Sequence, residues 1–94
     1  MQIRWTEVAI DSLERARVFI GNENPQAAAR VYELVLITAR RLSDNDTLGR
    51  PGRVDGTREL VVPRTRYIIA YTVFLGSVII LAVQHDAQKW PERF

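Results

Sequence analysis

The sequence predicts an α+β fold in which a pair of helices covers one face of an antiparallel β-sheet. Apolar residues recur at helical spacing across residues 7–42, whereas from residue 58 onward the apolar pattern is that of strands. Residues 44–57, which are rich in Asp, Gly, Pro and Arg, separate the two halves. With 94 residues, of which 47% are hydrophobic and 26% charged, the chain can build one small core. We therefore expect a single domain over residues 1–94.

The first half is predicted to be a short strand followed by a helical hairpin. Residues 2–5 form the strand, and Thr6 is the expected N-cap of a helix that ends at Gly21-Asn22. One apolar stripe runs along that helix at spacings of four, three and four residues: Ala9, Leu13, Ala16 and Ile20. Asn24 and Pro25 then start a second helix as its N-cap and first helical residue, so the connection between the helices is very short.

The second helix is more apolar than packing on one sheet requires. Its main stripe consists of Ala28, Val31, Val35 and Leu42. Four further apolar side chains lie off this stripe: Tyr32, Leu34, Leu36 and Ile37. A helix that is apolar on more than one side needs additional cover. We therefore predict that Tyr32 and Leu36 bind a partner.

Three strands are predicted in the second half, at residues 58–62, 66–74 and 78–85, joined as two antiparallel hairpins. The last two are apolar at nearly every position, as expected of central strands that are buried on both faces. Together with residues 2–5 they make a four-stranded sheet, one face of which the helices cover. The segment left for the other face, DAQKWPERF, is too small to cover it. We therefore expect another chain or a bound segment to dock there.

Composition excludes several classes of function. The chain has no Cys and a single His, which excludes a disulfide framework, thiolate chemistry, a Cys zinc site and a His metal cluster. Nucleotide-binding and zinc-protease motifs are missing, so we expect no cofactor and no metal. The segment MQIRWTEVAI does not have the pattern of a signal peptide, and the apolar run VIILAV is too short to span a bilayer. We expect a cytoplasmic protein that does not bind membranes.

Arginine dominates the basic residues, since Lys89 is the one lysine among 13 cations. Five arginines cluster around the central loop: Arg50, Arg53, Arg58, Arg64 and Arg66. One interpretation is an electropositive patch that binds either phosphate or the acidic surface of another protein. The other is a solvated rim whose arginines pair with Asp55 and Glu59. A high genomic GC content also raises Arg over Lys. The spacing of Gly49, Gly52 and Gly56 fits neither the P-loop nor the dinucleotide-binding motif, so we interpret these glycines as turn residues.

His85 is the main titratable candidate, at the end of the last strand and followed by Asp86. It is either a general acid or base, or a histidine that caps the sheet and binds backbone. Tyr67 and Tyr71 fall on one face of their strand, where packing is favoured over stacking on a base.

Taken in order, these elements resemble the ParE/RelE superfamily of bacterial type II toxin–antitoxin toxins. The resemblance runs from Trp5 to Pro91 and rests on WTEVAIDSL, ENPQAAARVYELVLITARRL, LGRPGRVDGTRELVV, RYIIAYTV and VIILAVQHDAQKWP. It implies an antiparallel sheet with the helical hairpin on one face. It also implies a cognate antitoxin that wraps the toxin in a hetero-oligomer. A dimer of the toxin is the other assembly that it allows.

The superfamily contains ribosome-dependent mRNA endonucleases, which are RelE-like, and DNA gyrase poisons, which are ParE-like. The nucleases often carry an Arg three residues before the tyrosine that Tyr71 resembles, and Ile68 stands there instead. Asp86 follows His85 where RNA would need a cation. We therefore predict a ParE-like toxin that inhibits gyrase by binding, without catalysis, through Arg50, Arg53, Arg58 and Trp90. The alternative is an mRNA endonuclease that uses His85 with Arg53, Arg58 or Arg66. A third reading is a degenerate member that binds its antitoxin but is no longer toxic.

Overall fold

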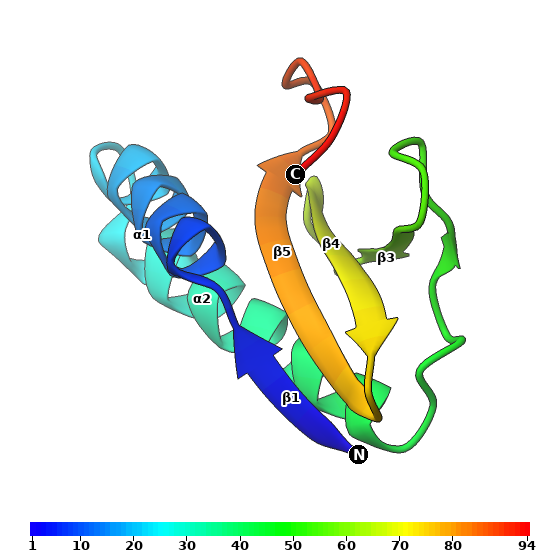
Figure 1. Ribbon diagram of the computed structural model, residues 1–94. Helices are drawn as coiled ribbons and strands as arrows, with labels where there is room; N and C mark the ends of the chain where they lie inside the picture. Colours follow the sequence, from blue (N-terminus) through cyan, green and yellow to red (C-terminus); the bar gives the residue numbers. More distant parts are fainter.

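The computed structural model describes residues 1–94 as two helices packed on one face of a five-stranded sheet (Figure 1). The strand order is β1-β5-β4-β3-β2, with β1 parallel to β5 and the other neighbours antiparallel. In chain order the elements are β1 (Gln2–Trp5), α1 (Glu7–Gly21), α2 (Pro25–Arg40), the 3₁₀ turn η1 (Arg41–Ser43), β2 (Arg50–Pro51), β3 (Arg58–Val61), β4 (Tyr67–Phe74) and β5 (Ser77–His85).

The predicted helix boundaries are confirmed by their caps. The Thr6 hydroxyl accepts a hydrogen bond from the Ala9 amide at 3.0 Å, and the Asn24 side chain accepts one from the Ala27 amide at 3.1 Å. Each cap satisfies an amide that has no partner inside its helix. Pro25 occupies the first helical position, as predicted.

The sheet has one strand more than predicted. Residues 50–51 were expected to be loop, but they pair with β3 at the edge of the sheet, Arg50 opposite Glu59 and Pro51 opposite Arg58. A strand of two residues is too short to show a period of two, so the sequence pattern could not reveal it. A proline is tolerated there because an edge strand does not need every amide.

The main core lies between the helices and the sheet. Tyr67, Ile69 and Tyr71 of β4 face the helices and pack in one cluster with Ala9, Leu13 and Val35 among others. On β5 the inward residues are Val78 and Ile80, and then Val83, because the pairing with β4 shifts by one residue between Ala70 and Tyr71. Such a bulge reverses which side chains face the core. Tyr67 and Tyr71 therefore pack in the sheet, the reading that was favoured.

The second face of the sheet is largely covered by the chain itself. Ile68, Ala70 and Ala82 alternate with the core residues and are nevertheless buried. The loop after β2 lies over this face, since the Thr72 hydroxyl donates to the Gly56 carbonyl at 2.9 Å. The C-terminal segment turns back at the end of β5 (Figure 1) and lines a cavity with Ala82. The expectation that this face needs another chain is therefore wrong at its centre, because the sequence did not reveal that loop and tail fold over it.

None of the helices combines the length and the apolar character needed to cross a bilayer.

Candidate functional site

The first two glycines of the loop GRPGRVDGTREL lie where neighbouring atoms leave no room for a side chain. A Cβ on Gly49 would lie 2.7 Å from the Glu59 carbonyl oxygen and 2.8 Å from the Tyr71 ring. A Cβ on Gly52 would lie 2.4 Å from the Thr57 hydroxyl. The Gly52 amide meanwhile donates to the Thr57 carbonyl at 2.7 Å. Only glycine fits these two positions without displacing neighbouring atoms.

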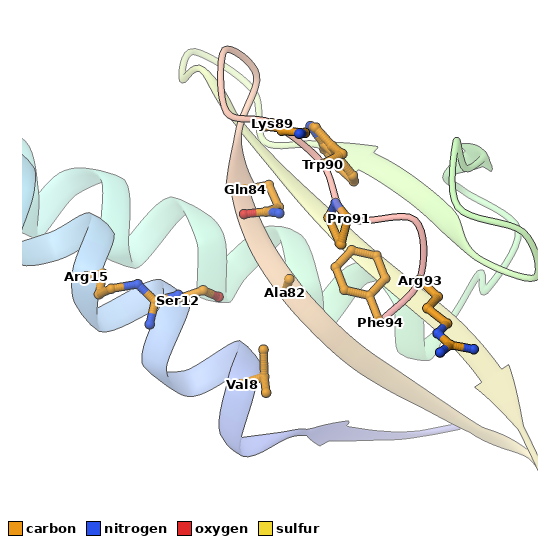
Figure 2. Close-up of a pocket in the computed structure, with 10 residues that line it drawn as sticks. All are labelled: Val8, Ser12, Arg15, Ala82, Gln84, Lys89, Trp90, Pro91, Arg93 and Phe94. Carbon is orange, nitrogen blue, oxygen red and sulfur yellow. The ribbon is translucent and has the colours of Figure 1, made fainter.

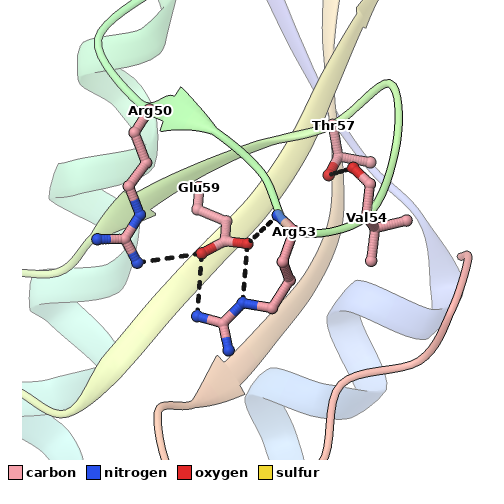
Figure 3. Close-up of polar contacts among 5 residues, drawn as sticks. All are labelled: Arg50, Arg53, Val54, Thr57 and Glu59. Carbon is pink, nitrogen blue, oxygen red and sulfur yellow. Dashed lines mark hydrogen bonds and ion pairs between the residues drawn. The ribbon is translucent and has the colours of Figure 1, made fainter.

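Glu59 is the centre of this loop (Figure 3). Its side chain is only 2% exposed and accepts the Arg53 amide at 2.7 Å and the Arg53 Nε and Nη2 atoms at 3.1 Å each. Arg50 Nη2 adds a further bond at 3.1 Å. Burial by itself would raise the pKa of Glu59, but the hydrogen bonds from Arg53 and Arg50 outweigh it and hold the pKa below its ordinary value. We call Glu59, Arg50 and Arg53 the arginine clamp.

Arg53 also contacts the C-terminal segment. Its guanidinium carbon lies 3.9 Å from the centre of the Trp90 ring, a cation–π contact. Trp90 in turn meets Phe94 edge to face, with ring centres 6.3 Å apart. Two residues predicted to contact a partner, Arg53 and Trp90, therefore contact each other.

The other three arginines of the predicted patch lie apart from Glu59, and two of them bind other groups of the chain. Arg58 donates from Nε to the Gly49 carbonyl at 2.9 Å, so it fastens the loop. Arg66 pairs with Asp86 at 3.0 Å. The pKa of the Asp86 carboxyl is lowered, mainly by the hydrogen bond from Arg66. Arg64 is exposed in the β3–β4 turn with φ of 64°. The five side chains do not converge on one site.

His85 lies at the end of β5, and its Nδ1 atom is 3.3 Å from Asp86 Oδ1, on the carboxylate that Arg66 also binds. Its Nδ1 atom accepts the Ala87 amide at 3.0 Å, and its ring meets Tyr67 edge to face at 5.2 Å. Burial raises the pKa of Tyr67, so that hydroxyl stays protonated. His85 is paired across the sheet with Tyr67, whereas Arg58 is opposite Tyr71. Four residues of strand separate those positions by roughly 13 Å along the sheet.

Two positions on β4 were compared with the nucleases of the superfamily. Ile68 and Tyr71 are both buried. The Tyr71 hydroxyl donates to the Asp46 carbonyl at 2.7 Å and accepts the Gly49 amide at 3.0 Å, so it holds two points of the loop. It acts as a structural support for the arginine clamp. No cluster of three or more potential metal ligands is present.

A groove along α1 was not predicted. It consists of a hollow of about 720 Å³ beside Phe19, Tyr67 and His85 and one of about 450 Å³ beside Val8, Ala82 and Trp90. The two share Ser12, Arg15 and Gln84 as walls; Figure 2 shows the smaller one, between α1, β5 and the tail. Val8, Ser12, Arg15 and Phe19 follow spacings of four, three and four, a second stripe beside the core stripe. That spacing was the available signal.

Tyr32 and Leu36 lie together on α2. Tyr32 is 37% exposed, whereas Leu36 is half-buried against the core. The pair leaves only part of its surface for a partner, and that role stays a prediction.

This architecture, a helical hairpin packed on one face of a five-stranded sheet, is that of the small α+β toxins of the ParE/RelE type. The family model described as "ParE toxin of type II toxin-antitoxin system, parDE" matches residues 3–90. The chain therefore belongs to the ParE toxin family of type II toxin–antitoxin systems.

Relatives agree with this assignment, and solved structures share the fold. The chain is 40% identical over 91 residues to "Putative toxin Y4kP" of Sinorhizobium fredii, covering 97% of this chain and 94% of the relative. It is 32% identical over 87 residues to "Toxin RelE2" of Caulobacter vibrioides, covering 93% and 97%. The fold resembles a chain of the chromosomal ParDE system from P. aeruginosa, with a TM-score of 0.82, 23% identity and coverage of 90% and 95%. A chain of the RelBE2 complex from Mycobacterium tuberculosis gives a TM-score of 0.59 at 26% identity, with coverage of 93% and 92%.

Proposed function

We propose that this toxin arrests growth by binding DNA gyrase and that a cognate antitoxin neutralises it. The observation that carries the proposal is the absence of a nuclease constellation at the family positions. Ile68 and Tyr71 are buried, and the arginines that could stabilise a phosphate transition state are held by Glu59, by Asp86 or by backbone carbonyls. In-line RNA cleavage needs a base and free cations within reach of one phosphate. The ParE membership favours the same conclusion.

Purified toxin should inhibit negative supercoiling by gyrase and accumulate cleaved DNA. The His85→Ala variant should do so equally well, because a binding mechanism does not use the imidazole. Gyrase that supercoils normally at a large excess of folded toxin would rule the proposal out.

A second candidate function is mRNA cleavage, since two relatives carry RelE names and His85 opens onto the larger hollow. In that case His85 is the acid or base, and the His85→Ala variant loses all toxicity. Mapping of transcript 5′ ends after induction distinguishes the two mechanisms. Cuts in phase with codons support cleavage, and intact transcripts during growth arrest exclude it.

The antitoxin is proposed to dock in the groove along α1. Val8, Val18 and Phe19 are exposed there, Phe19 by 72%, so an apolar helix or extended segment finds a continuous surface. The Phe19→Asp variant should lose co-purification with the antitoxin encoded beside it. Phe74→Asp is the matched control, because Phe74 is similarly exposed but lies at the β4–β5 turn. Loss of the antitoxin from both variants, or from neither, argues against this groove.

Induction of the toxin without its antitoxin tests whether the chain is toxic at all. Unimpaired growth with folded protein in the cells would reduce the function to antitoxin binding.

A further inference from the structure

The two hollows of the groove along α1 meet at a polar position. Val8 lies beside the smaller hollow and Phe19 beside the larger one, 61% and 72% exposed. They are 11 residues apart on one helix, or roughly 16 Å. Between them, Ser12, Arg15 and Gln84 line both hollows; Figure 2 shows the first two on α1 and Gln84 on β5. A segment that fills both hollows therefore passes these three side chains.

Arg15 and Gln84 are available to a ligand, whereas Ser12 is not. The Ser12 hydroxyl donates to the Ala9 carbonyl and accepts the Val83 amide, each at 2.8 Å. Arg15 is exposed and forms no ion pair. The Gln84 side chain is half-buried and forms no hydrogen bond within the chain. The junction of the two hollows thus presents a free guanidinium and a free amide.

Tyr67 adds a buried hydroxyl to the larger hollow. The residue is only 7% exposed and lines that hollow, yet its hydroxyl forms no hydrogen bond within the chain, unlike that of Tyr71. Burial raises the pKa of Tyr67, so the hydroxyl stays protonated and can donate. A buried donor without a partner is unfavourable, so this hydroxyl gains from an acceptor that enters the hollow.

The charge of Arg15 is not cancelled by the acidic residues around the groove. Glu14 lines the larger hollow, but its carboxylate is bound by Arg17. Asp11 lies one turn before Arg15 on α1, lines neither hollow and forms no ion pair with it. The tail beside the smaller hollow carries cations, but Glu92 lies among them and offsets part of their charge. The junction, through Arg15, therefore complements a negative group.

We propose that the antitoxin segment in this groove carries a carboxylate side chain between two large apolar side chains, and that Arg15 and Tyr67 recognise the carboxylate. The apolar side chains fill the two hollows, while the guanidinium, the Tyr67 hydroxyl and the Gln84 amide donate to the carboxylate oxygens. A wholly apolar segment would leave Arg15 and Tyr67 unpaired in a dry interface, so these residues select the cognate antitoxin. The inference rests on the proposed function only in taking the groove as the antitoxin site.

The first experiment measures the Kd of folded toxin for the antitoxin encoded beside it, by isothermal titration calorimetry. Arg15→Gln should weaken binding about 10- to 100-fold, and Tyr67→Phe about tenfold. Arg30→Gln removes the same charge from an exposed site on α2, outside the groove, and should leave Kd unchanged. The double variant Arg15→Gln with Tyr67→Phe should weaken binding by less than the product of the two single effects, because both groups bind one carboxylate.

Melting temperatures establish that each variant is folded. Wild-type affinity in the folded Arg15→Gln variant would overturn the inference. Single effects that multiply fully in the double variant would do the same, because the two residues would then not share a ligand.

The second experiment identifies the carboxylate by exchanging charges. Arg15→Glu should abolish detectable binding, and each Asp or Glu of the antitoxin is then replaced in turn by Arg. Affinity that returns with one antitoxin position, or with two adjacent ones, supports the inference. Return with none, or with positions scattered along the antitoxin, contradicts it.

The inference and the docking site fail separately. If Phe19→Asp loses the antitoxin while Arg15→Gln and Tyr67→Phe bind it like wild type, the groove is the site and the carboxylate inference falls. If Phe19→Asp and Arg15→Gln both bind normally, the docking site is wrong and the inference falls with it. None of these measurements includes gyrase, so the identity of the target does not affect them.

Discussion

At Glu59, burial and ion pairing act on one carboxyl group in opposite directions. Burial disfavours the charged form, whereas Arg53 and Arg50 favour it, and the pKa falls below 4.5 because the hydrogen bonds prevail. Breaking such a buried pair from the carboxylate side leaves two cations without their partner, but both are about half exposed to water. We expect Glu59→Ala to lower the free energy of unfolding by about 2–3 kcal/mol, measured by urea denaturation.

The depressed pKa of Glu59 also makes stability depend on pH. The unfolded chain takes up this proton near pH 4.5, while the folded chain keeps the carboxylate ionised to lower pH. The contribution of Glu59 is therefore complete above that pH and is lost as the pH falls through the folded-state value. Melting temperatures between pH 3 and pH 7 should drop more steeply below about pH 4.5 in the wild type than in Glu59→Gln. Parallel curves would contradict this.

Gly49 has no room for a side chain in the folded protein. Gly49→Ala would place a methyl group against the Glu59 carbonyl and the Tyr71 ring and should destabilise the fold by about 2–4 kcal/mol. Gly21→Ala is the matched control, since its new Cβ would lie 3.6 Å from Ala28, an ordinary contact. Thermal unfolding of the two variants side by side should separate them clearly.

The β4–β5 turn carries an unfavourable residue. Leu75 and Gly76 both have positive φ, 49° and 77°, as a two-residue hairpin turn requires. Glycine adopts this conformation readily, but leucine does so at a cost, and this leucine is 87% exposed. Leu75→Asn should stabilise the protein by about 0.5–1 kcal/mol, which is roughly 2–8 °C in melting temperature. Leu75→Val should lower it, because a branched Cβ aggravates the crowding.

Local rules predicted most of the elements. Thr6, Asn24 and Pro25 marked the helix starts, and residues 75–77 separated the last two predicted strands. These signals work because each depends on backbone groups a few residues apart. The strand β2 and the bulge in β5 were not predicted, since pairing across the sheet and a shift of register leave no short-range pattern.

The candidate site was predicted less well than the fold. Arg53, Trp90 and His85 were named individually, but the Arg53–Trp90 contact joins residues 37 positions apart. Glu59 was treated as a surface counter-ion because a single carboxylate among arginines reads that way. Glu59 lies opposite Arg50 in the pairing of β2 with β3. Because that pairing was not predicted, the burial of Glu59 was not predicted either. The α1 groove required knowing which side of α1 faces β5.

At the scale of the molecule, the toxin exposes more apolar surface on α1 than a monomer needs. Val8, Ile10, Val18 and Phe19 are all at least 48% exposed. We expect the isolated toxin to self-associate, as measured by analytical ultracentrifugation, and the antitoxin to reverse this. At a free antitoxin concentration of 100 times Kd, mass action adds about 2.7 kcal/mol of stability, so the melting temperature should rise. Equal melting temperatures with and without antitoxin would contradict this prediction.

The parallel pairing of β1 with β5 joins residues near 2–5 to residues near 77–80. Since β5 also pairs with β4 along its whole length, it is an interior strand and the last one that the ribosome delivers. A nascent chain that stops before β5 therefore leaves β1 without a neighbouring strand and lacks the β5 core residues Val78, Ile80 and Val83. We therefore expect the domain to become able to bind an antitoxin only once β5 has been synthesised.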